Sequence, residues 1–310
     1  MDPRADNSVT LRAPNMMNLD GADHSRLRNL VQQAFTPKSV ENFREHLHKI
    51  ANMCLSSMPE GPVNIVKRLS KPMPTIAVAD YIGIDSTRHE DFKRWTDSLT
   101  KRGYPVPRED QWSEIVDADT SLRSFLAEVV ADRSQNPGDD LVSRLINARD
   151  KDQRLSTDEI VEMCFLLIGA GNFTTTDLIS NCVYSHLTKT ESQALDEASL
   201  VSQTLKVDPP VLSIRRNVTE DIDVGGKTIK QGAVVSLLIG AANHDQVNTG
   251  TNLSFGRGLH HCLGAPLAKL EAEVAIRCFR ERYPDASLIS ATRSKRMDFR
   301  GFNSLIVEPS

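Results

Sequence analysis

The chain has 310 residues, a hydrophobic fraction of 39% and a formal net charge of -4, from 37 Lys and Arg against 41 Asp and Glu. This length can bury a substantial core, and the slightly acidic balance gives no electrostatic reason to expect nucleic acid or an anionic membrane as a partner. No apolar run reaches the roughly eighteen residues of a membrane-spanning helix, and we expect no secretory signal in the polar first residues. We therefore predict a cytoplasmic protein with no membrane anchor and no nucleic-acid partner.

The first two-thirds of the chain predicts a helical body. Residues 1–18 are polar and irregular, and we expect a loose arm there. Helical periodicity with few strand signals then continues to about residue 200, interrupted by proline and glycine breaks. These breaks lie at residues 59–62, 103–107 and 136–138. No internal repeat or long linker divides residues 19–310, so we predict a single domain there.

Two cationic side chains stand together near the start of this body. His24 and Arg28 are four residues apart, which places both on one face of a predicted helix. Such a pair can bind an anionic group on a ligand. A solvated helix surface is the alternative interpretation of either residue.

A second helix is predicted from Ser156, which forms a capping box with Glu159 ahead of the apolar segment 160–171. The segment is apolar nearly all round, so the helix is expected to run through the core. Gly171 inside it costs about 1 kcal/mol relative to alanine, which predicts a packing or ligand reason for this glycine. The Thr174 hydroxyl can bond the carbonyl four residues back and open a groove for a small ligand. A buried helix with a polar kink and no ligand is the alternative.

The last third of the chain predicts a small β portion. Short runs rich in β-branched residues lie at 211–214, 222–224, 228–229 and 234–239. Gly225-Gly226 is predicted as a tight hairpin turn between two of them. We expect a terminal strand over residues 305–307 to join these strands. The predicted fold class is therefore mainly α with a small β portion.

One cysteine lies in a glycine-rich loop directly ahead of an amphipathic helix. The loop is Phe255-Gly256-Arg257-Gly258-Leu259-His260-His261-Cys262-Leu263-Gly264. The apolar residues after it have helical spacing, with Pro266 in the first turn. A helix N-terminus favours an anion, so the thiol of Cys262 is expected to ionise readily and to ligate a metal. The loop glycines would let the backbone approach a flat ligand.

Two other interpretations of this loop are an inert buried cysteine and a zinc site. A zinc site would use His260, His261 and Cys262, but the side chains of adjacent residues point in different directions. The sequence contains no second Cys/His cluster with ligand spacing. Zinc is therefore disfavoured.

The loop resembles the cysteine loop of the cytochrome P450 superfamily, whose pattern is Phe, Gly, any, Gly, any, His, any, Cys, any, Gly. Every fixed position of that pattern is met here. The resemblance implies a P450-like helical fold around a buried haem b, with Cys262 as the iron ligand and with Phe255, His260 and Gly264 beside the cofactor. It also implies a monooxygenase, an oxidoreductase in which the thiolate ligand favours cleavage of dioxygen.

Two further segments supply cations that the resemblance assigns to the haem propionates. Residues 19–28 look like the family's His-x-x-x-Arg segment, which implies that His24 and Arg28 bind these carboxylates. Arg216 follows residues 208–211 at the family's spacing for a propionate-binding arginine, and His260 comes from the cysteine loop itself. Buried carboxylates need such partners, because an unpaired buried charge is costly.

Residues 170–175 are similar to the family's oxygen-binding segment, which implies catalytic roles for Gly171 and Thr174. In the family an acid precedes the first threonine and helps to deliver protons. Phe173 stands at that position here. Protons would then have to come through water or the substrate, and we hypothesise more uncoupled turnover to peroxide.

The chain departs from the family in the support around the cysteine loop. The family braces this loop with a Glu-x-x-Arg pair, and the matching residues here are Gln203 and Lys206, so a bidentate ion pair is lost. Most of the family's meander is missing, because Asn243 is followed within ten residues by Leu253. The resemblance therefore covers about residues 16–308 with gaps. It implies an incomplete P450-like domain that is shortened at the N-terminus and in the meander.

We predict a haem-thiolate monooxygenase that inserts one oxygen atom of O2 into a small hydrophobic substrate. The chain of 310 residues leaves no room for a reductase domain. Electrons would come from a ferredoxin or flavodoxin-type donor with an NAD(P)H-dependent reductase. A degenerate or truncated haem-binding protein without monooxygenase activity is the alternative, and a cofactor-free helical interaction module is a third hypothesis.

Overall fold

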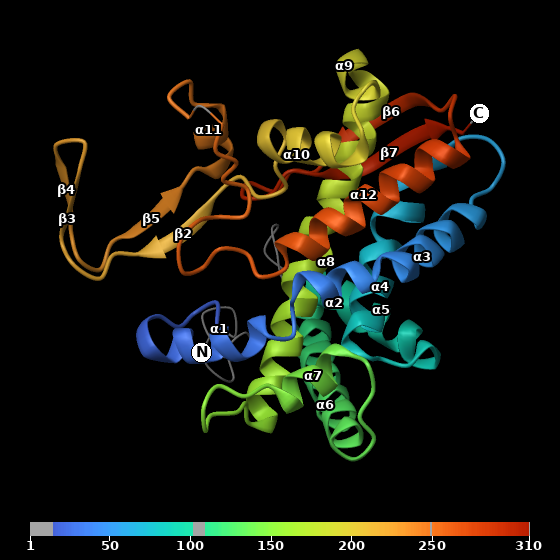
Figure 1. Ribbon diagram of the computed structural model, residues 1–310. Helices are drawn as coiled ribbons and strands as arrows, with labels where there is room; N and C mark the ends of the chain where they lie inside the picture. The colour runs from blue at the N-terminus through green and yellow to red at the C-terminus, as the bar shows by residue number, and fades with distance from the viewer. Residues whose placement is uncertain (1–14, 102–108, 249, 310) are drawn as a thin grey trace.

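A computed structural model describes residues 15–101, 109–248 and 250–309 (Figure 1). The helices are α1 (Gly21–Gln32), α2 (Pro37–Asn42), α3 (Arg44–Ser56), α4 (Pro72–Ile82), α5 (His89–Thr100), α6 (Glu109–Gln135), α7 (Leu141–Asn147), α8 (Thr157–Thr188), α9 (Thr190–Gln193), α10 (Glu197–Val207), α11 (Ile239–His244) and α12 (Ala265–Arg282). The strands are β1 (Val63–Asn64), β2 (Ile214–Asn217), β3 (Ile222–Val224), β4 (Lys227–Ile229), β5 (Val234–Leu237), β6 (Ser287–Arg293) and β7 (Phe302–Glu308). The predicted mainly α class with a small β portion is confirmed.

The helix predicted from Ser156 is α8, which runs through the middle of the helical body (Figure 1). Its capping box is formed, because Ser156 Oγ accepts a hydrogen bond from the Glu159 amide at 3.2 Å and Glu159 Oε2 accepts one from the Ser156 amide at 2.8 Å. α8 packs against α4, α6, α10 and α12. Residues 160–164 and Ile168 are buried, whereas Gly169 and Ala170 are exposed. The predicted core helix is therefore confirmed except near the end of its apolar segment.

The helix predicted after the cysteine loop is α12, and Pro266 occupies its first turn as expected. Its apolar stripe is buried at Leu267, Leu270, Val274 and Cys278. This stripe packs against α3, α8 and α10. Burying one such leucine contributes roughly 1.5–3 kcal/mol, so α12 is anchored firmly and carries the loop ahead of it into a fixed position.

Three small antiparallel sheets complete the fold. β7 lies between β1 and β6, β2 pairs with β5, and β3 pairs with β4 across the predicted Gly225-Gly226 turn. Figure 1 shows the β2–β5 and β3–β4 pairs projecting to one side of the helical body. The predicted segments 222–224, 228–229 and 234–239 are confirmed as strands, apart from small differences at their ends.

The terminal strand does not join these projecting strands, so that prediction was wrong. β7 pairs with β6 and β1 instead, with Val63 opposite Val307. The reason is burial: Leu305 and Val307 alternate along β7 and are buried with Phe302 in the main core, whereas β2 and β5 have mostly exposed residues. The predicted strand at 211–214 also begins later, at Ile214.

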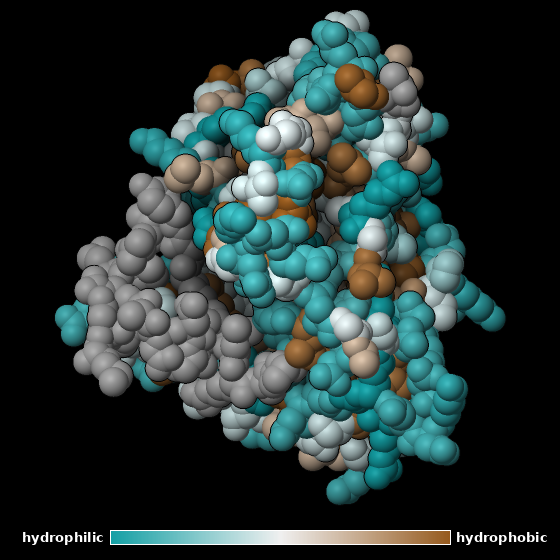
Figure 2. Space-filling model, turned by 90° about the vertical axis from the view of Figure 1, so that its left-hand side faces the viewer, coloured by the Kyte–Doolittle hydropathy of each residue, from teal (hydrophilic) through white to brown (hydrophobic). Residues whose placement is uncertain are grey.

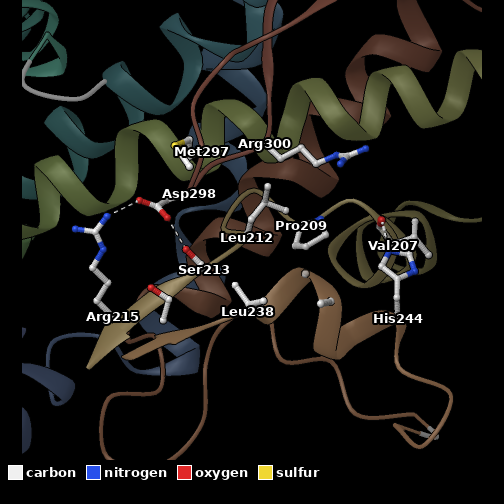
Figure 3. A pocket seen from close by; sticks show the side chains of 13 residues that line it. Val207, Pro209, Leu212, Ser213, Arg215, Leu238, His244, Met297, Asp298 and Arg300 are labelled. Carbon is white, nitrogen blue, oxygen red and sulfur yellow. Dashed lines mark hydrogen bonds and ion pairs between the residues drawn. The ribbon is translucent and has the colours of Figure 1, made fainter. Parts of the chain in front are cut away.

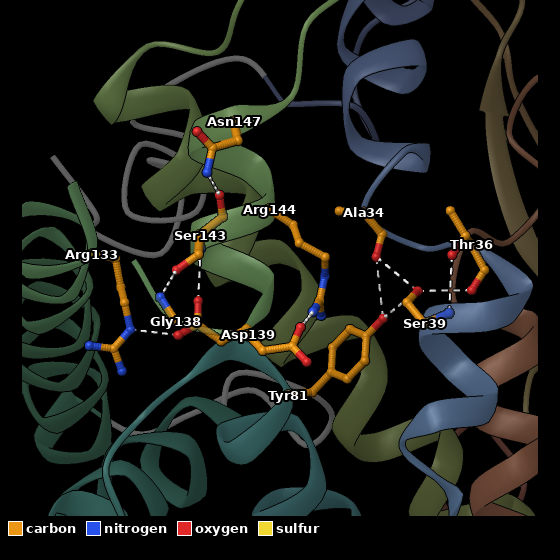
Figure 4. Close-up of polar contacts among 11 residues, drawn as sticks. Ala34, Thr36, Ser39, Tyr81, Arg133, Gly138, Asp139, Ser143, Arg144 and Asn147 are labelled. Atoms are coloured by element: carbon orange, nitrogen blue, oxygen red, sulfur yellow. Dashed lines mark hydrogen bonds and ion pairs between the residues drawn. The ribbon is translucent and has the colours of Figure 1, made fainter. Parts of the chain in front are cut away.

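The predicted break at residues 136–138 is a tight turn between α6 and α7 (Figure 4). Asp140 caps α7 by accepting a hydrogen bond from the Ser143 amide at 2.8 Å, and Ser143 Oγ in turn accepts one from the Gly138 amide at 2.9 Å. Arg133 at the end of α6 donates to Asp140 Oδ2 at 2.5 Å. The break at 103–107 lies outside the described residues.

The predicted loose arm falls mostly outside the described residues, which begin at Asn15. Residues 15–18 form a turn in which Met16 is buried. In the part of the chain that the structure describes, no helix combines the length and the apolar character needed to cross a membrane. On the face that Figure 2 shows, hydrophobic surface is broken into small areas between polar ones.

Candidate functional site

The cysteine loop is folded against its own backbone just before α12. The Cys262 amide donates to the Phe255 carbonyl at 2.9 Å, and the Gly256 amide donates to the Leu253 carbonyl at 2.8 Å. Gly256 and Gly258 have φ values of +69° and +80°, in the left-handed region that favours glycine. The two glycines are therefore required by the course of the loop, which presents Cys262 at the N-terminal end of α12.

The Cys262 residue is exposed, whereas the other cysteines, Cys54, Cys164, Cys182 and Cys278, are buried. The amides of Gly264 and Ala265 bond to its sulfur and, with the nearby Arg28, favour the thiolate. Loss of hydration around the sulfur is the larger effect and raises the pKa of the thiol. The expectation that the thiol ionises readily by itself was therefore wrong, because desolvation outweighs the helix N-terminus. A bound cation would supply the missing stabilisation.

The predicted histidines meet at the same place from opposite ends of the chain. His24 of α1 is only 1% exposed, and its ring centroid lies 4.3 Å from that of His260. His260 Nε2 donates to Asp20 Oδ1 at 2.7 Å, and this hydrogen bond holds the pKa of Asp20 below its ordinary value. Sequence reasoning missed Asp20, since no local signal links it to a histidine so far along the chain.

Neither ring nitrogen of His24 has a hydrogen-bond partner among the described residues. Burial lowers the pKa of His24, and the neighbouring His260 and Arg28 lower it further. A buried polar group without a partner costs about 1–3 kcal/mol. A carboxylate placed here would accept a hydrogen bond from the ring and remove that cost.

The predicted arginines converge on this region. Arg28 acts electrostatically on both His24 and Cys262, and Arg216 of β2 acts on Asp20. The structure therefore brings the sulfur and all four predicted cations, His24, Arg28, Arg216 and His260, around one site. This arrangement provides positive partners for more than one carboxylate close to a potential metal ligand.

The middle of α8 has an open face. Gly169 and Ala170 are exposed within a helix that is otherwise largely buried. No atom would lie within 4 Å of a Cβ added at Gly169 or Gly171, so packing within the protein does not demand these glycines. Thr174 Oγ1 donates to the Ala170 carbonyl at 2.8 Å, as predicted. The helix continues to Thr188 without interruption.

A groove of about 560 Å³ lies away from these residues (Figure 3). It is bordered by α11, by the ends of β2 and β5, and by the segment before β7. Arg215 lines it, and the neighbouring Arg216 points to the opposite face of β2. None of the predicted site residues lines this groove. It is therefore separate from the cysteine loop and its cations.

The observed site fits a haem. Cys262 stands at a loop that allows a flat ligand to approach, His24 lacks an acceptor among the described residues, and cations are available for two carboxylates. The glycines of α8 leave space on one side without any packing reason for it. A mainly α fold with these features defines a haem-thiolate protein.

Comparison with known proteins places the chain in a family. It is 32% identical to cytochrome P450 107B1 of Saccharopolyspora erythraea over an alignment of 321 residues, covering 96% of this chain and 77% of that protein. It is 34% identical to 6-deoxyerythronolide B hydroxylase of the same organism over 296 residues, covering 89% and 72%. The structure of CYP109E1 from Bacillus megaterium in complex with testosterone matches with a TM-score of 0.90 at 28% identity, covering 96% of this chain and 87% of that chain.

No family model matches the chain. At this identity and coverage, however, the chain belongs to the cytochrome P450 family. It is a haem-thiolate monooxygenase, an oxidoreductase with a haem-iron cofactor. The predicted P450-like fold is confirmed.

Proposed function

We propose that this chain binds haem b through Cys262 and inserts one oxygen atom of O2 into a small apolar substrate. The observation that carries the site assignment is the position of Arg28, which acts both on the cysteine sulfur and on the unpartnered His24. Bound haem supplies the redox chemistry with dioxygen. The protein binds and orients the cofactor, excludes water and supplies protons.

Cys262 is the proposed iron ligand, and the amides of Gly264 and Ala265 hold its sulfur in place. His24, Arg28, Arg216 and His260 are the proposed partners of the two haem carboxylates. His260 already donates to Asp20, so on binding it would share or exchange this partner. A haem carboxylate would stabilise His24 more than the other three residues, because the His24 ring has no other acceptor among the described residues.

Gly171 and Thr174 are proposed to line the oxygen side. Thr174 Oγ1 uses its proton in the bond to the Ala170 carbonyl, so its lone pairs can accept a hydrogen bond from a water in the open space. Rotation of the hydroxyl away from the Ala170 carbonyl would let Thr174 donate its proton into that space while its oxygen takes a proton from the water in return. Phe173 offers no carboxyl group for this purpose.

The substrate class is proposed as a small hydrophobic molecule, which the testosterone complex of the structural relative supports. We propose a ferredoxin or flavodoxin-type electron donor with an NAD(P)H-dependent reductase, and a cytoplasmic location. The hydroxylase among the sequence relatives favours a working monooxygenase over an inactive haem-binding protein.

The test is turnover of haem-loaded protein with a surrogate ferredoxin or flavodoxin, its reductase and isotopically labelled dioxygen. Small hydrophobic compounds, including steroids and fatty acids, are supplied one at a time. The proposal predicts a product that carries a single labelled oxygen atom. A product labelled only from water, or no product from well-loaded protein across the panel, would contradict it.

A further inference from the structure

Gln203 and Lys206 occupy the positions of the family's Glu-x-x-Arg pair, but they do not interact with each other here. Gln203 Oε1 accepts a hydrogen bond from Ser192 Oγ at 3.4 Å. Among the described residues, neither a hydrogen bond nor an ion pair joins Gln203 to Lys206. Helix α10, which carries both, must therefore be tied to the cysteine loop by other groups.

Asn243, at the end of α11, makes that connection. It is 2% exposed, and both the nitrogen and the oxygen of its amide group form hydrogen bonds. Nδ2 donates to the Leu205 carbonyl of α10 at 3.3 Å and to Ser254 Oγ at 2.8 Å, while Oδ1 accepts from the Leu253 amide at 2.8 Å. Ser254 Oγ also donates to the Leu205 carbonyl. One buried side chain thus joins α10 to the two residues that lead into the cysteine loop.

The end of α10 explains why the Leu205 carbonyl can accept hydrogen bonds from Asn243 and Ser254. The last turn of a helix leaves carbonyl groups without partners inside the helix. The Leu205 carbonyl is satisfied by Asn243 and Ser254, and the Val207 carbonyl accepts from His244 Nε2 at 2.9 Å (Figure 3). Consecutive side chains at the end of α11 therefore cap α10, and the cap holds α11 in place.

Hydrogen bonds continue from this joint to the predicted iron ligand. The Leu253 carbonyl accepts from the Gly256 amide at 2.8 Å, and the Phe255 carbonyl accepts from the Cys262 amide at 2.9 Å. The path from α10 through Asn243 to the backbone of Cys262 is thus short; it is buried at Leu205 and Asn243 and half-buried from Leu253 to Phe255. A shift at Leu253 would move Phe255 and with it the amide that fixes Cys262.

We infer that Asn243 is a positioning residue for Cys262, and that with Ser254 it takes over the brace that Gln203 and Lys206 no longer form. Asn243 acts through Leu253 and the loop backbone. The inference rests on the proposed role of Cys262 as the haem ligand. It concerns the state of the sulfur–iron bond rather than the presence of haem.

The test compares haem-loaded wild type with Asn243→Ala and Ser254→Ala by the optical spectrum of the reduced, carbon monoxide-treated protein. A red-shifted Soret band reports thiolate ligation, and an unshifted band reports its loss. In Asn243→Ala the ratio of unshifted to red-shifted absorbance should rise roughly tenfold, which corresponds to losing one or two hydrogen bonds. Ser254→Ala should move the ratio in the same direction by less. The double variant should be no worse than Asn243→Ala, because the two side chains act as a unit.

The control is Asn52→Ala, an exposed asparagine on α3, which should leave the ratio unchanged. A purely structural role for Asn243 would lower the melting temperature and haem content but leave the retained haem red-shifted, and that result overturns the inference. Should Asn243→Ala fail to fold, an unchanged ratio in Ser254→Ala overturns it instead. A wild type without any red-shifted band would refute the proposed function and this inference together.

Discussion

Phe173 is the residue at which this chain differs most directly from the family's oxygen-side chemistry. It follows Asn172 and precedes Thr174, whose hydroxyl is engaged with the Ala170 carbonyl. A phenyl ring can neither donate nor accept a proton, so in the proposed function the supply of protons would fall to Thr174 and water. The hypothesis of uncoupled turnover follows, because a slower proton supply would lower the fraction of reduced dioxygen that is used productively.

Replacing Phe173 with glutamate should therefore lower the peroxide released per NAD(P)H consumed. A positioned acid contributes about 10²–10⁴-fold to a proton transfer, so even an imperfectly placed carboxyl group should reduce the peroxide fraction severalfold. Peroxide and NAD(P)H are measured in the same turnover assay. Phe173→Gln, which has similar size without the acid, is the matched control. Equal peroxide fractions in wild type and Phe173→Glu would refute the hypothesis.

At this scale, local patterns predicted individual residues well where the chemistry is local. The cysteine loop is continuous in sequence, and Thr174 reaches only one helical turn back. The meeting of His24 with His260 depends on the whole fold and was inferred only through the family resemblance. The bond from His260 to Asp20 also depends on the whole fold and was missed. The raised pKa of Cys262 was missed, since desolvation depends on tertiary packing.

Among the elements, α8, which carries Gly171 and Thr174, is connected to α1, which carries His24 and Arg28. Glu159 of its capping box also forms an ion pair with Arg26 of α1, the helix that carries His24 and Arg28. The start of α8 is thus connected to the helix proposed to bind the haem carboxylates. Fraying at this end would loosen both elements.

Ser156→Ala should lower the free energy of unfolding by about 1 kcal/mol, the usual cost of losing an N-cap side chain. Chemical denaturation followed by circular dichroism measures this change. Ser113→Ala, an exposed serine within α6, serves as the control and should change stability by less than about 0.5 kcal/mol. If the two variants are equally stable, the capping box does not support α8.

Sequence patterns predicted an element correctly where it has a long apolar face or a clear capping signal. α8 and α12 have long apolar faces and clear first turns, so both were recognised. β1 has only two residues, and β6 is mostly exposed, so neither has a periodic signal. The pairing of β7 was predicted wrongly because strand partners are chosen by burial across the whole molecule.

The whole molecule contains a buried carboxyl group that links its stability to pH. Glu271 of α12 is 5% exposed, and its Oε2 has no partner among the described residues. Burial raises the pKa of Glu271 from an ordinary 4.5 to about 8. The folded protein therefore keeps the carboxyl neutral at pH values where the unfolded chain ionises it.

Stability should consequently fall as the pH rises from 4.5 to about 8, because the unfolded state then binds fewer protons than the folded state. Glu271 changes the free energy of unfolding by about 1.4 kcal/mol per pH unit in this window. Its stabilising contribution is present in full below pH 4.5 and is lost progressively as the pH rises to about 8. Glu271→Gln should flatten this part of the profile in urea titrations. Glu281→Gln, an exposed residue on the same helix, should keep the wild-type slope. Identical slopes for wild type and Glu271→Gln would show that Glu271 does not titrate this way.

The most direct measurement for the whole account is the carbon monoxide spectrum of the reduced, haem-loaded protein before and after Cys262→Ser, with the buried Cys278→Ser on α12 as control. Wild type and Cys278→Ser should give a red-shifted Soret band, whereas Cys262→Ser should lose that shift and retain less haem. A Cys262→Ser protein that takes up as much haem and has the same spectrum as wild type would contradict the account.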